Sequence, residues 1–352
     1  MSNIVDNLPP FSVQSSQEVM KMDEKIKISL PKETFQLLKK DCEDFKVLKE
    51  NGTINMNSFV NTLIVNFYEE FSASEEQLHD EIKEALFSVP EAYKEKAFDE
   101  IIRVIAKRTS GERVKNESTT LSFKPTKMSE REITFIENVL IKKETISSFY
   151  RRMFIRYSQK TKNEREKIIH KENYQLLSRA IEKGTTVCIT LRTNQILPSE
   201  APYAVASSQD ELFNYLLCYS DKDNHTIRLA NIKSVSLLPQ KASIPKKNEE
   251  LFKKQLEQGV QYPFYPSDDE PIKVELTEKG KRLFQKIYLY RPTPSKIEGN
   301  IYTFNCSANQ ALYYFERFGD SAIILSPKRL GITMRNYHYY ALKKYRTVYE
   351  KD

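Results

Sequence analysis

Hydrophobic and polar residues alternate from Lys25 to Pro31, and this period of two is typical of a strand with one buried face. A helical pattern follows, whose apolar positions share one face: Phe35, Leu38 and Cys42. Gly52 interrupts it, and Asn55 or Asn57 then supplies the cap of a second helix. The apolar positions of that helix are Phe59, Leu63 and Phe67. The segment is therefore predicted to fold as strand, helix, turn and helix.

The same order of patterns recurs between Thr119 and Lys160. A short alternating stretch runs from Thr119 to Lys124. Two helical stretches follow, with apolar positions at Ile133, Ile136, Leu140, Phe149, Met153 and Tyr157. A lone strand leaves the hydrogen-bonding groups of its edges unpaired. We therefore expect the two strands to pair with each other within one chain.

This duplicated pattern resembles the ribbon-helix-helix family, in which two such units intertwine and their strands form one antiparallel ribbon. In that family, the ribbon side chains that point away from the helices enter the major groove of DNA. The corresponding residues here are Lys25, Lys27, Ser29, Thr120, Ser122 and Lys124. Alternatively, these positions are the ordinary solvated faces of two short strands.

Charge is distributed unevenly along this half of the chain. Residues 69–100 hold 11 acidic residues against 3 lysines, whereas residues 103–183 hold 20 Lys and Arg against 10 Glu. The basic block, which includes Arg151, Arg152 and Arg156, favours binding to a phosphate backbone. Alternatively, its interspersed glutamates form ion pairs with lysines and arginines one helical turn away.

The order of patterns predicts an α+β protein of several domains. Residues 1–22 are polar and expected to be flexible, and residues 23–160 form the duplicated unit. Residues 74–108 predict two amphipathic helices inserted between the copies. A linker helix over 161–184 ends at Gly184, because the pattern changes there from helical to alternating.

Five short strands are expected over 185–192, 195–207, 212–220, 225–230 and 232–238, a spacing that suggests a small barrel. Three stretches in it resemble the WYL domain, an SH3-like or Sm-like barrel of bacterial transcription regulators and CRISPR-associated regulators. They are Pro202 to Val205, Asn214 to Tyr219 and Ile227 to Val235. Asn214 stands where the family's tripeptide has its tryptophan.

The WYL resemblance implies a basic pocket that receives a nucleic-acid end or a nucleotide-like ligand. Arg228 matches the family's arginine, and the positions expected near the pocket are Arg192, Tyr203, Ser207 and Tyr215. An arginine fork suits a phosphate, and a tyrosine ring stacks on an unpaired base. Alternatively, Tyr203 and Tyr215 are core aromatics and Arg228 is the partner in a structural ion pair.

Residues 241–352 are expected to form a third unit with a βαβαβα order of elements. This layout resembles the C-terminal extension that often follows a WYL domain, a small α/β module tied to dimerisation. Its last helix interleaves aromatic and basic residues, namely Tyr337, Tyr339, Tyr340, Tyr345, Tyr349, Arg335, Lys343, Lys344 and Arg346. Such a helix either stacks bases or forms a tyrosine-rich contact in a homodimer.

Composition narrows the functional class. The chain of 352 residues has no run of 18 apolar residues, and Met1 to Gln17 lacks the layout of a signal peptide, so we expect a cytoplasmic protein without a membrane partner. The four cysteines and four histidines are scattered, which predicts no disulfide, metal site or cofactor. Catalytic motifs are also missing, so we expect no enzyme.

Taken together, a ribbon-helix-helix front and a WYL back resemble the WYL-domain accessory proteins of type VI-D CRISPR systems. That resemblance implies a regulator that binds single-stranded RNA and stimulates an RNA-guided, RNA-cleaving effector. The alternative is a DNA-binding transcription regulator whose WYL domain senses a nucleotide-like ligand.

Overall fold

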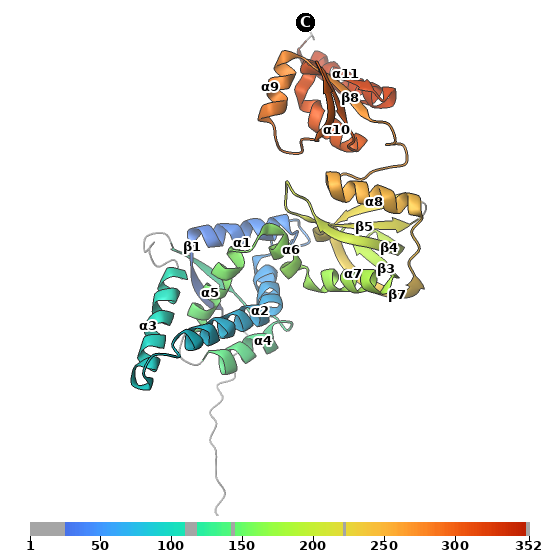
Figure 1. Cartoon of the computed structure of the whole chain (residues 1–352). Coiled ribbons are helices and arrows are strands. Elements are labelled where there is room, and N and C mark those ends of the chain that lie inside the picture. The colour runs from blue at the N-terminus through green and yellow to red at the C-terminus, as the bar shows by residue number, and fades with distance from the viewer. Residues whose placement is uncertain (1–24, 110–117, 142–144, 221–222, 350–352) are drawn as a thin grey trace, which may run out of the picture.

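A computed structural model describes residues 25–109, 118–141, 145–220 and 223–349, and Figure 1 shows three units that follow one another along the chain. Each unit contains one sheet, and every strand pair is antiparallel. With helices packed beside antiparallel sheets, the chain is an α+β protein, as predicted. The predicted flexible segment 1–22 lies outside the described residues.

The first unit is built on a two-stranded ribbon. Strand β1 (Ile26–Pro31) pairs antiparallel with β2 (Ser118–Phe123) within the chain, with Lys27 opposite Ser122 and Ser29 opposite Thr120. The alternate residues are buried, namely Ile26, Ile28, Leu30, Leu121 and Phe123. The predicted alternation is therefore confirmed in both strands.

Helices pack on the buried face of this ribbon. The helices of the first copy are α1 (Lys32–Asp44) and α2 (Met56–Ala85). Those of the second are α4 (Glu130–Phe135), which continues as a π-helical turn (Ile136–Leu140), and α5 (Ile146–Ser158). The predicted apolar positions lie in one core, fully buried or partly buried at its edge.

The insertion differs from the expectation. Helix α2 runs unbroken through 30 residues, so the second helix of the first copy and the expected first helix of the insertion are one helix. No glycine or proline interrupts the chain between Met56 and Ala85, and the serines at 72 and 74 are tolerated inside a helix. Helix α3 (Glu91–Thr109) then folds back to contact α5.

Two helices connect the first unit to the second. Helices α6 (Lys162–Ile169) and α7 (Lys171–Lys183) are separate, so the helical pattern restarts after α5. Thr161 and Glu164 form a reciprocal capping box at the start of α6. Gly184 ends α7 in the left-handed conformation, at φ 61°, as its position predicted.

The second unit contains the five expected strands, β3 (Thr185–Leu191), β4 (Ile196–Ser207), β5 (Asn214–Ser220), β6 (Asp223–Arg228) and β7 (Ile232–Lys241). Their order is β6-β5-β4-β3-β7, which leaves β6 and β7 as edges. The five expected strands therefore form one continuous antiparallel sheet, and the SH3-like or Sm-like barrel stays a prediction. Helix α7 covers one face, and α8 (Lys246–Gln258) covers the other (Figure 1).

The third unit has a four-stranded sheet in the order β11-β8-β10-β9. Its elements are β8 (Ile272–Leu276), α9 (Glu278–Lys286), β9 (Pro294–Glu298), β10 (Ile301–Phe304), α10 (Ala308–Phe315), a 3₁₀ turn (Glu316–Ser321), β11 (Ala322–Ser326) and α11 (Lys328–Tyr349). Strand β9 was missed, although Gly299 at φ 62° marks the hairpin turn that joins it to β10. Among the described residues, no helix is long and apolar enough to span a bilayer.

Candidate nucleic-acid interface

Positively charged side chains from both units meet where the first unit contacts the five-stranded sheet. Lys46 follows α1, Arg192 follows β3, and Arg228 ends β6. Burial lowers the pKa of Lys46, and the positive charges of Arg228 and Arg192 lower it further. Together with Lys162 of α6, these three residues are called the junction cluster below.

A short turn between β6 and β7 accepts hydrogen bonds from two members of this cluster. Lys46 adopts the left-handed conformation at φ 55°, which turns the chain after α1. Its Nζ donates a hydrogen bond of 2.5 Å to Oδ1 of Asn231, and Nε of Arg192 donates one of 2.7 Å to the carbonyl oxygen of Ala230. Ala230 and Asn231 belong to the 3₁₀ turn Leu229–Asn231, so this turn brings the two cations together.

Arg228 contacts the first unit directly. A terminal guanidinium nitrogen donates a hydrogen bond of 2.5 Å to the carbonyl oxygen of Asp44, and Nε lies 3.7 Å from Oε1 of Glu166. The guanidinium also lies over the Phe213 ring, 3.2 Å from its centroid. This is the structural ion pair that the sequence offered as the alternative role of Arg228. Binding of a phosphate by Arg228 stays a prediction.

Glu166 is the buried acid at this junction. Its side chain has no exposed surface, and burial raises its pKa. Its Oε2 accepts hydrogen bonds from the backbone nitrogen of Asn214 at 2.6 Å and from Nδ2 of Asn214 at 2.8 Å. Asn214 therefore holds a carboxylate in place.

Lys162 also lies over the Phe213 ring, with Nζ 3.6 Å from the ring centroid and 2.9 Å from Oδ2 of Asp44. Asp44 and Glu166 thus pair with Lys162 and Arg228. Within the described part of the chain, Lys46 and Arg192 have no carboxylate within ion-pair distance. The junction cluster consequently has two positive charges without an acidic partner.

His170 adds no positive charge at neutral pH. Burial lowers its pKa to about 4, and the charges of Arg192 and Arg228 contribute to that shift. Its Nε2 lies 3.0 Å from the carbonyl oxygen of Phe45, which accepts the hydrogen bond from a neutral ring. This hydrogen bond therefore stabilises the backbone at Phe45, directly before Lys46.

The other residues expected near the pocket divide into two groups. Ser207 accepts a hydrogen bond of 3.0 Å from Asn163 and donates one of 2.9 Å to Asn214, so it lies next to Glu166. Tyr215 lies opposite Arg228 in the β5–β6 register, and its hydroxyl is 3.3 Å from Glu211. The Tyr203 ring stacks on Phe252 of α8 with centroids 5.0 Å apart, and Tyr203 and Tyr215 both pack against the cluster around Phe252.

The outer face of the ribbon is polar. Lys25, Lys27, Thr120 and Ser122 are exposed, and Ser29 is half-buried. The backbone carbonyl of Ser29 accepts a hydrogen bond of 2.6 Å from Nε of Arg151. The expected direction of these side chains is confirmed, whereas their contact with DNA stays a prediction.

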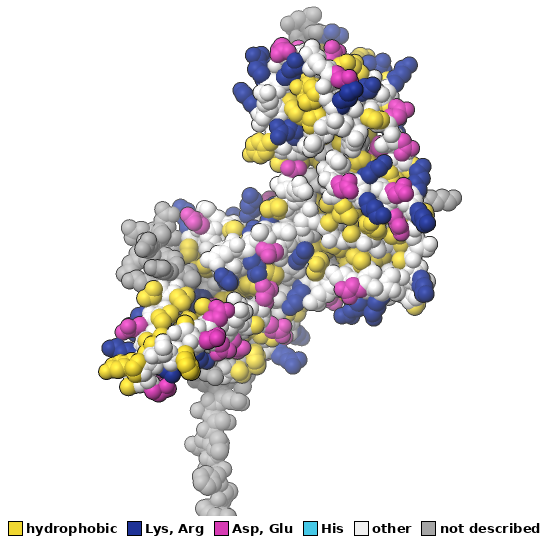
Figure 2. Space-filling model, viewed as in Figure 1, with side chains coloured by type: hydrophobic (Ala, Val, Ile, Leu, Met, Phe, Trp, Pro, Cys, Tyr) yellow, Lys and Arg dark blue, Asp and Glu magenta, His cyan; other side chains and the backbone are white. Residues whose placement is uncertain are grey.

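Several cations of the basic block pair with acids of the first unit. Arg152 pairs with Glu75, and Lys160 lies 2.6 Å from Glu70, both of which belong to the acidic stretch 69–100. Arg165 pairs with the buried Asp41 at 2.6 Å, whereas Arg156 is exposed. These pairs join different segments of the chain, so they are not pairs within one helix. In Figure 2, basic and acidic side chains are interspersed on all three units.

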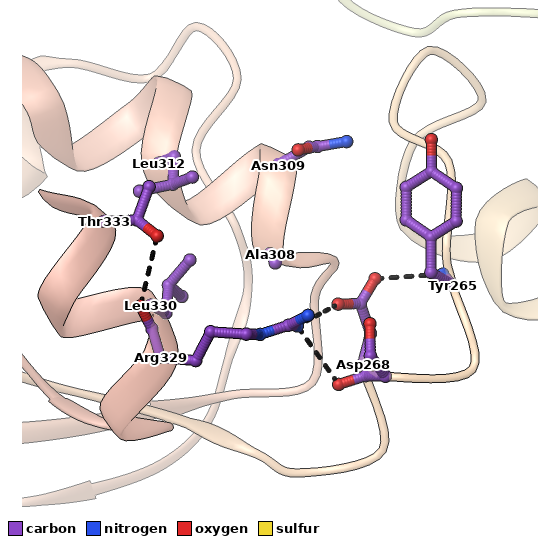
Figure 3. A pocket seen from close by; sticks show the side chains of 9 residues that line it. Tyr265, Asp268, Ala308, Asn309, Leu312, Arg329, Leu330 and Thr333 are labelled. Carbon is purple, nitrogen blue, oxygen red and sulfur yellow. Dashed lines mark hydrogen bonds and ion pairs between the residues drawn. The ribbon is translucent and has the colours of Figure 1, made fainter. Parts of the chain in front are cut away.

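A pocket of about 190 Å³ in the third unit also contains an arginine, but this arginine, unlike Lys46 and Arg192 of the junction cluster, has an acidic partner among the described residues (Figure 3). A terminal nitrogen of Arg329 lies 3.6 Å from Asp268, whose side chain is almost fully buried and accepts a hydrogen bond of 3.0 Å from the backbone nitrogen of Tyr265. The arginine and the aspartate neutralise each other. This pocket therefore attracts an anion less strongly than the junction cluster does.

Comparison with known proteins shows the fold. No protein-family model matches the chain, and no curated protein matches it. A crystal structure of a CRISPR Cas-related protein superposes with a TM-score of 0.60 at 20% identity, over 93% of this chain and 95% of that chain. The whole arrangement of units thus has a counterpart of nearly the same extent. The proteasome accessory factor B/C (PafBC) of Arthrobacter aurescens matches at a TM-score of only 0.23 and 17% identity, over 64% of this chain and 37% of that one.

Proposed function

We propose that this protein is a non-enzymatic, nucleic-acid-binding regulator of a CRISPR system, and that it binds single-stranded RNA at the junction cluster. The observation that carries the proposal is the pair of cations, Lys46 and Arg192, that lie close together without a carboxylate partner among the described residues. Arg192 is exposed and Lys46 is half-buried, so solvent reaches the pair.

Crowded cations favour an anion. Positive charges that lie close together repel one another, which raises the free energy of the charged side chains. A bound phosphate would offset this repulsion with its negative charge. An arginine fork binds two phosphate oxygens, and a lysine adds a point charge. The neighbouring Arg228 and Lys162 would add long-range attraction, although each already has an acidic partner.

The β1–β2 ribbon is a weaker candidate for the main nucleic-acid-binding surface. Its second strand carries only Ser and Thr on its outer face, namely Ser118, Thr120 and Ser122. Affinity for duplex DNA depends on the number of phosphates that lysines and arginines neutralise. This supports single-stranded RNA over duplex DNA as the main ligand.

The CRISPR part of the proposal is supported by the shared fold. The similar structure belongs to a CRISPR Cas-related protein, and the likeness covers nearly all of both chains. Resemblance of the sequence to WYL-domain accessory proteins of type VI-D systems points to the same context. We therefore propose an RNA-guided, RNA-cleaving effector as the protein partner.

The test is a titration of labelled single-stranded RNA, followed by fluorescence anisotropy at several salt concentrations. Lys46→Gln and Arg192→Gln should each weaken binding about tenfold or more, since a charge-assisted hydrogen bond contributes about 1.5 to 3 kcal/mol. The slope of log affinity against log salt should fall by about 0.7 for each lost contact. Matched controls are Lys247→Gln on α8 and Arg282→Gln on α9, both at exposed positions.

Melting curves of the same four variants separate binding from folding. Unchanged melting temperatures with weaker RNA binding in the two junction variants would support the site. Equal RNA affinity in all four variants would refute it. Tighter binding to matched duplex DNA than to RNA would refute the choice of ligand.

One observation favours a second candidate, a DNA-binding transcription regulator. The ribbon forms within the chain with Lys27 opposite Ser122, and their side chains face solvent, as a strand pair in a major groove requires. In that case, Lys27→Gln and Ser122→Ala would weaken duplex binding, and the junction variants would leave it unchanged. The two candidates therefore predict opposite effects in one set of variants.

A further inference from the structure

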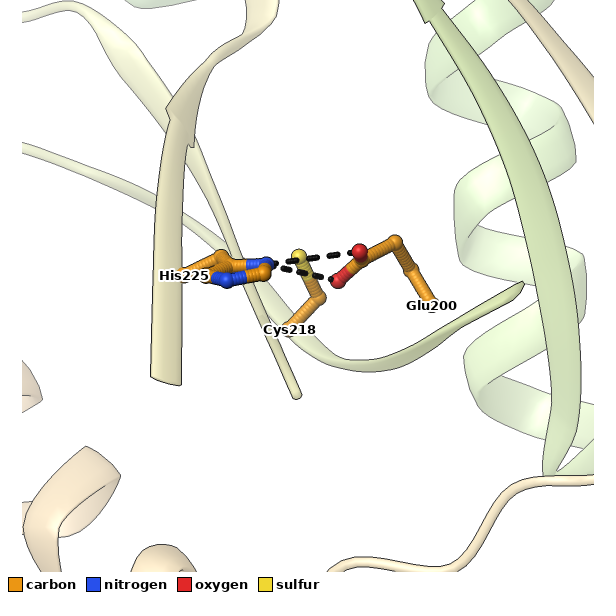
Figure 4. Close-up of side chains that lie close together, drawn as sticks. All are labelled: Glu200, Cys218 and His225. Atoms are coloured by element: carbon orange, nitrogen blue, oxygen red, sulfur yellow. Dashed lines mark hydrogen bonds and ion pairs between the residues drawn. The ribbon is translucent and has the colours of Figure 1, made fainter. Parts of the chain in front are cut away.

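Three potential metal ligands from three successive strands converge in the five-stranded sheet. Glu200 of β4, Cys218 of β5 and His225 of β6 each offer a ligand atom, and these atoms all lie within 4.8 Å of one another (Figure 4). The expectation of no metal site rested on the scatter of cysteines and histidines along the sequence. The sheet brings two of them together with a glutamate.

Strand register explains the convergence. Cys218 lies directly opposite His225 in the β5–β6 pair, so their side chains are on the same face. Cys218 also lies opposite Pro202 in the β4–β5 pair, and Glu200, two residues before Pro202, shares its face. Three adjacent strands therefore present a thiol, an imidazole and a carboxylate to one point.

The surroundings of the three side chains are those of a prepared site. The Glu200 side chain is 1% exposed and Cys218 is fully buried, whereas the His225 side chain is 34% exposed. Ser220 donates a hydrogen bond of 2.6 Å to Oε1 of Glu200, and Nδ1 of His225 lies 3.1 Å from Oε2. A hydroxyl that orients a carboxylate is typical of the outer shell of a metal site. The exposed side of His225 gives an ion a path of entry.

We propose that Glu200, Cys218 and His225 bind one Zn²⁺ ion, with a water molecule in the fourth position. Thiolate, imidazole and carboxylate are the ligands that Zn²⁺ uses, and three protein ligands with one open position form a known tetrahedral arrangement. Mg²⁺ and Ca²⁺ prefer oxygen ligands alone, so a site with a thiolate and an imidazole disfavours them. Binding releases the thiol proton to solvent.

The test uses the full-length protein, treated with a chelator and then loaded with Zn²⁺ or with Co²⁺ as a spectroscopic probe. We expect one metal ion per chain by elemental analysis, and a thiolate-to-cobalt charge-transfer band in the near ultraviolet. Cys218→Ser should abolish the band, and His225→Gln should lower the metal content at least tenfold. The control is Cys188→Ser on β3, a half-buried cysteine of the same sheet outside the cluster, which should keep both signals.

Folding is monitored separately, because Cys218 is fully buried. His225 is partly exposed, so its variant tests the site even if Cys218→Ser unfolds. Zn²⁺ should also raise the melting temperature of the wild type and of Cys188→Ser, since a ligand that binds only the folded state stabilises it. Less than stoichiometric metal in the wild type, or an unchanged cobalt spectrum in His225→Gln, would overturn the proposal. In that case, Glu200 and His225 form only an ion pair.

Discussion

Nε of Arg228 lies 3.7 Å from Oε1 of Glu166, and the Glu166 side chain has no exposed surface. Neither atom has a hydrogen bond to another described atom, whereas Oε2 of Glu166 and a terminal nitrogen of Arg228 each form hydrogen bonds, so the ion pair adds to those contacts in offsetting burial. This relationship ties β6 of the sheet to α6, and through the Asp44 carbonyl it ties the sheet to α1.

Arg228→Ala should therefore destabilise the protein. It leaves Glu166 buried without its cation, which costs on the order of 3 to 5 kcal/mol. Urea denaturation of the variant measures this loss. Arg156→Ala, at an exposed position on α5, is the control and should change the free energy of unfolding by less than about 0.5 kcal/mol. Adding Glu166→Gln to Arg228→Ala should recover part of the loss. A stable Arg228→Ala variant that binds RNA weakly would instead support the phosphate-binding role of Arg228.

His170 should make stability depend on pH. Its pKa in the folded protein is about 4, below the 6.5 of a free histidine, because the ring is buried near Arg192 and Arg228. The folded state thus binds the proton less tightly than the unfolded state. The resulting stability is present above pH 6.5 and is lost as the pH falls towards about 4, by up to about 3 kcal/mol.

Denaturation of wild type and His170→Gln at several pH values between 7 and 4 measures this contribution. The variant should lose less stability across the range, because glutamine does not titrate. His79→Gln, at a half-exposed position on α2, is the control and should behave as the wild type does. Parallel curves for wild type and His170→Gln would contradict the assignment.

Gly280→Ala should destabilise the third unit. Gly280 lies in the first turn of α9, and a Cβ at this position would overlap the backbone carbonyl oxygen of Ser321. Because backbone must move to make room, a loss of about 1 to 3 kcal/mol is expected. Arg282→Ala, at an exposed position of the same helix, is the control. Equal melting temperatures for the two variants would show that α9 and the Ser321 segment separate at little cost.

We propose that the tyrosine-rich helix α11 forms a homodimer contact. Its exposed tyrosines are 52% to 76% accessible, namely Tyr337, Tyr339, Tyr340, Tyr345 and Tyr349. Aromatic residues are enriched in the cores of protein interfaces. Light scattering should show a dimer for the wild type and a monomer for the double variant Tyr339→Ser, Tyr345→Ser. Tyr93→Ser on α3 replaces an equally exposed tyrosine elsewhere and should remain dimeric. A monomeric wild type would exclude the contact.

Local pattern was sufficient for most elements. The alternation from Lys25 to Pro31 predicted a strand and its buried face, because side chains of a strand alternate regardless of their neighbours. Gly184 was recognised as a helix end for a similar reason, since its left-handed conformation depends on the residue itself. Such signals act within a few residues, so the sequence alone determined them.

Element boundaries were less certain where the local signal was ambiguous. Ser72 and Ser74 are residue types that often cap helices, yet α2 continues through both because nothing after them breaks the helix. Strand β9 is exposed along most of its length, so it has no buried face to produce an alternation. Its turn at Gly299 was the one local signal for it.

The candidate sites depended on tertiary structure. No local pattern marks Lys46, because a lysine in a turn is usually solvated; it acquires its neighbours only when α1 docks against the turn at Asn231. Glu200, Cys218 and His225 come from three strands, and the register of those strands decides that they meet. Side-chain chemistry is therefore encoded residue by residue. The gathering of these side chains at one site requires separate strands and helices to pack together. Only the packing of the whole chain decides which of them do so.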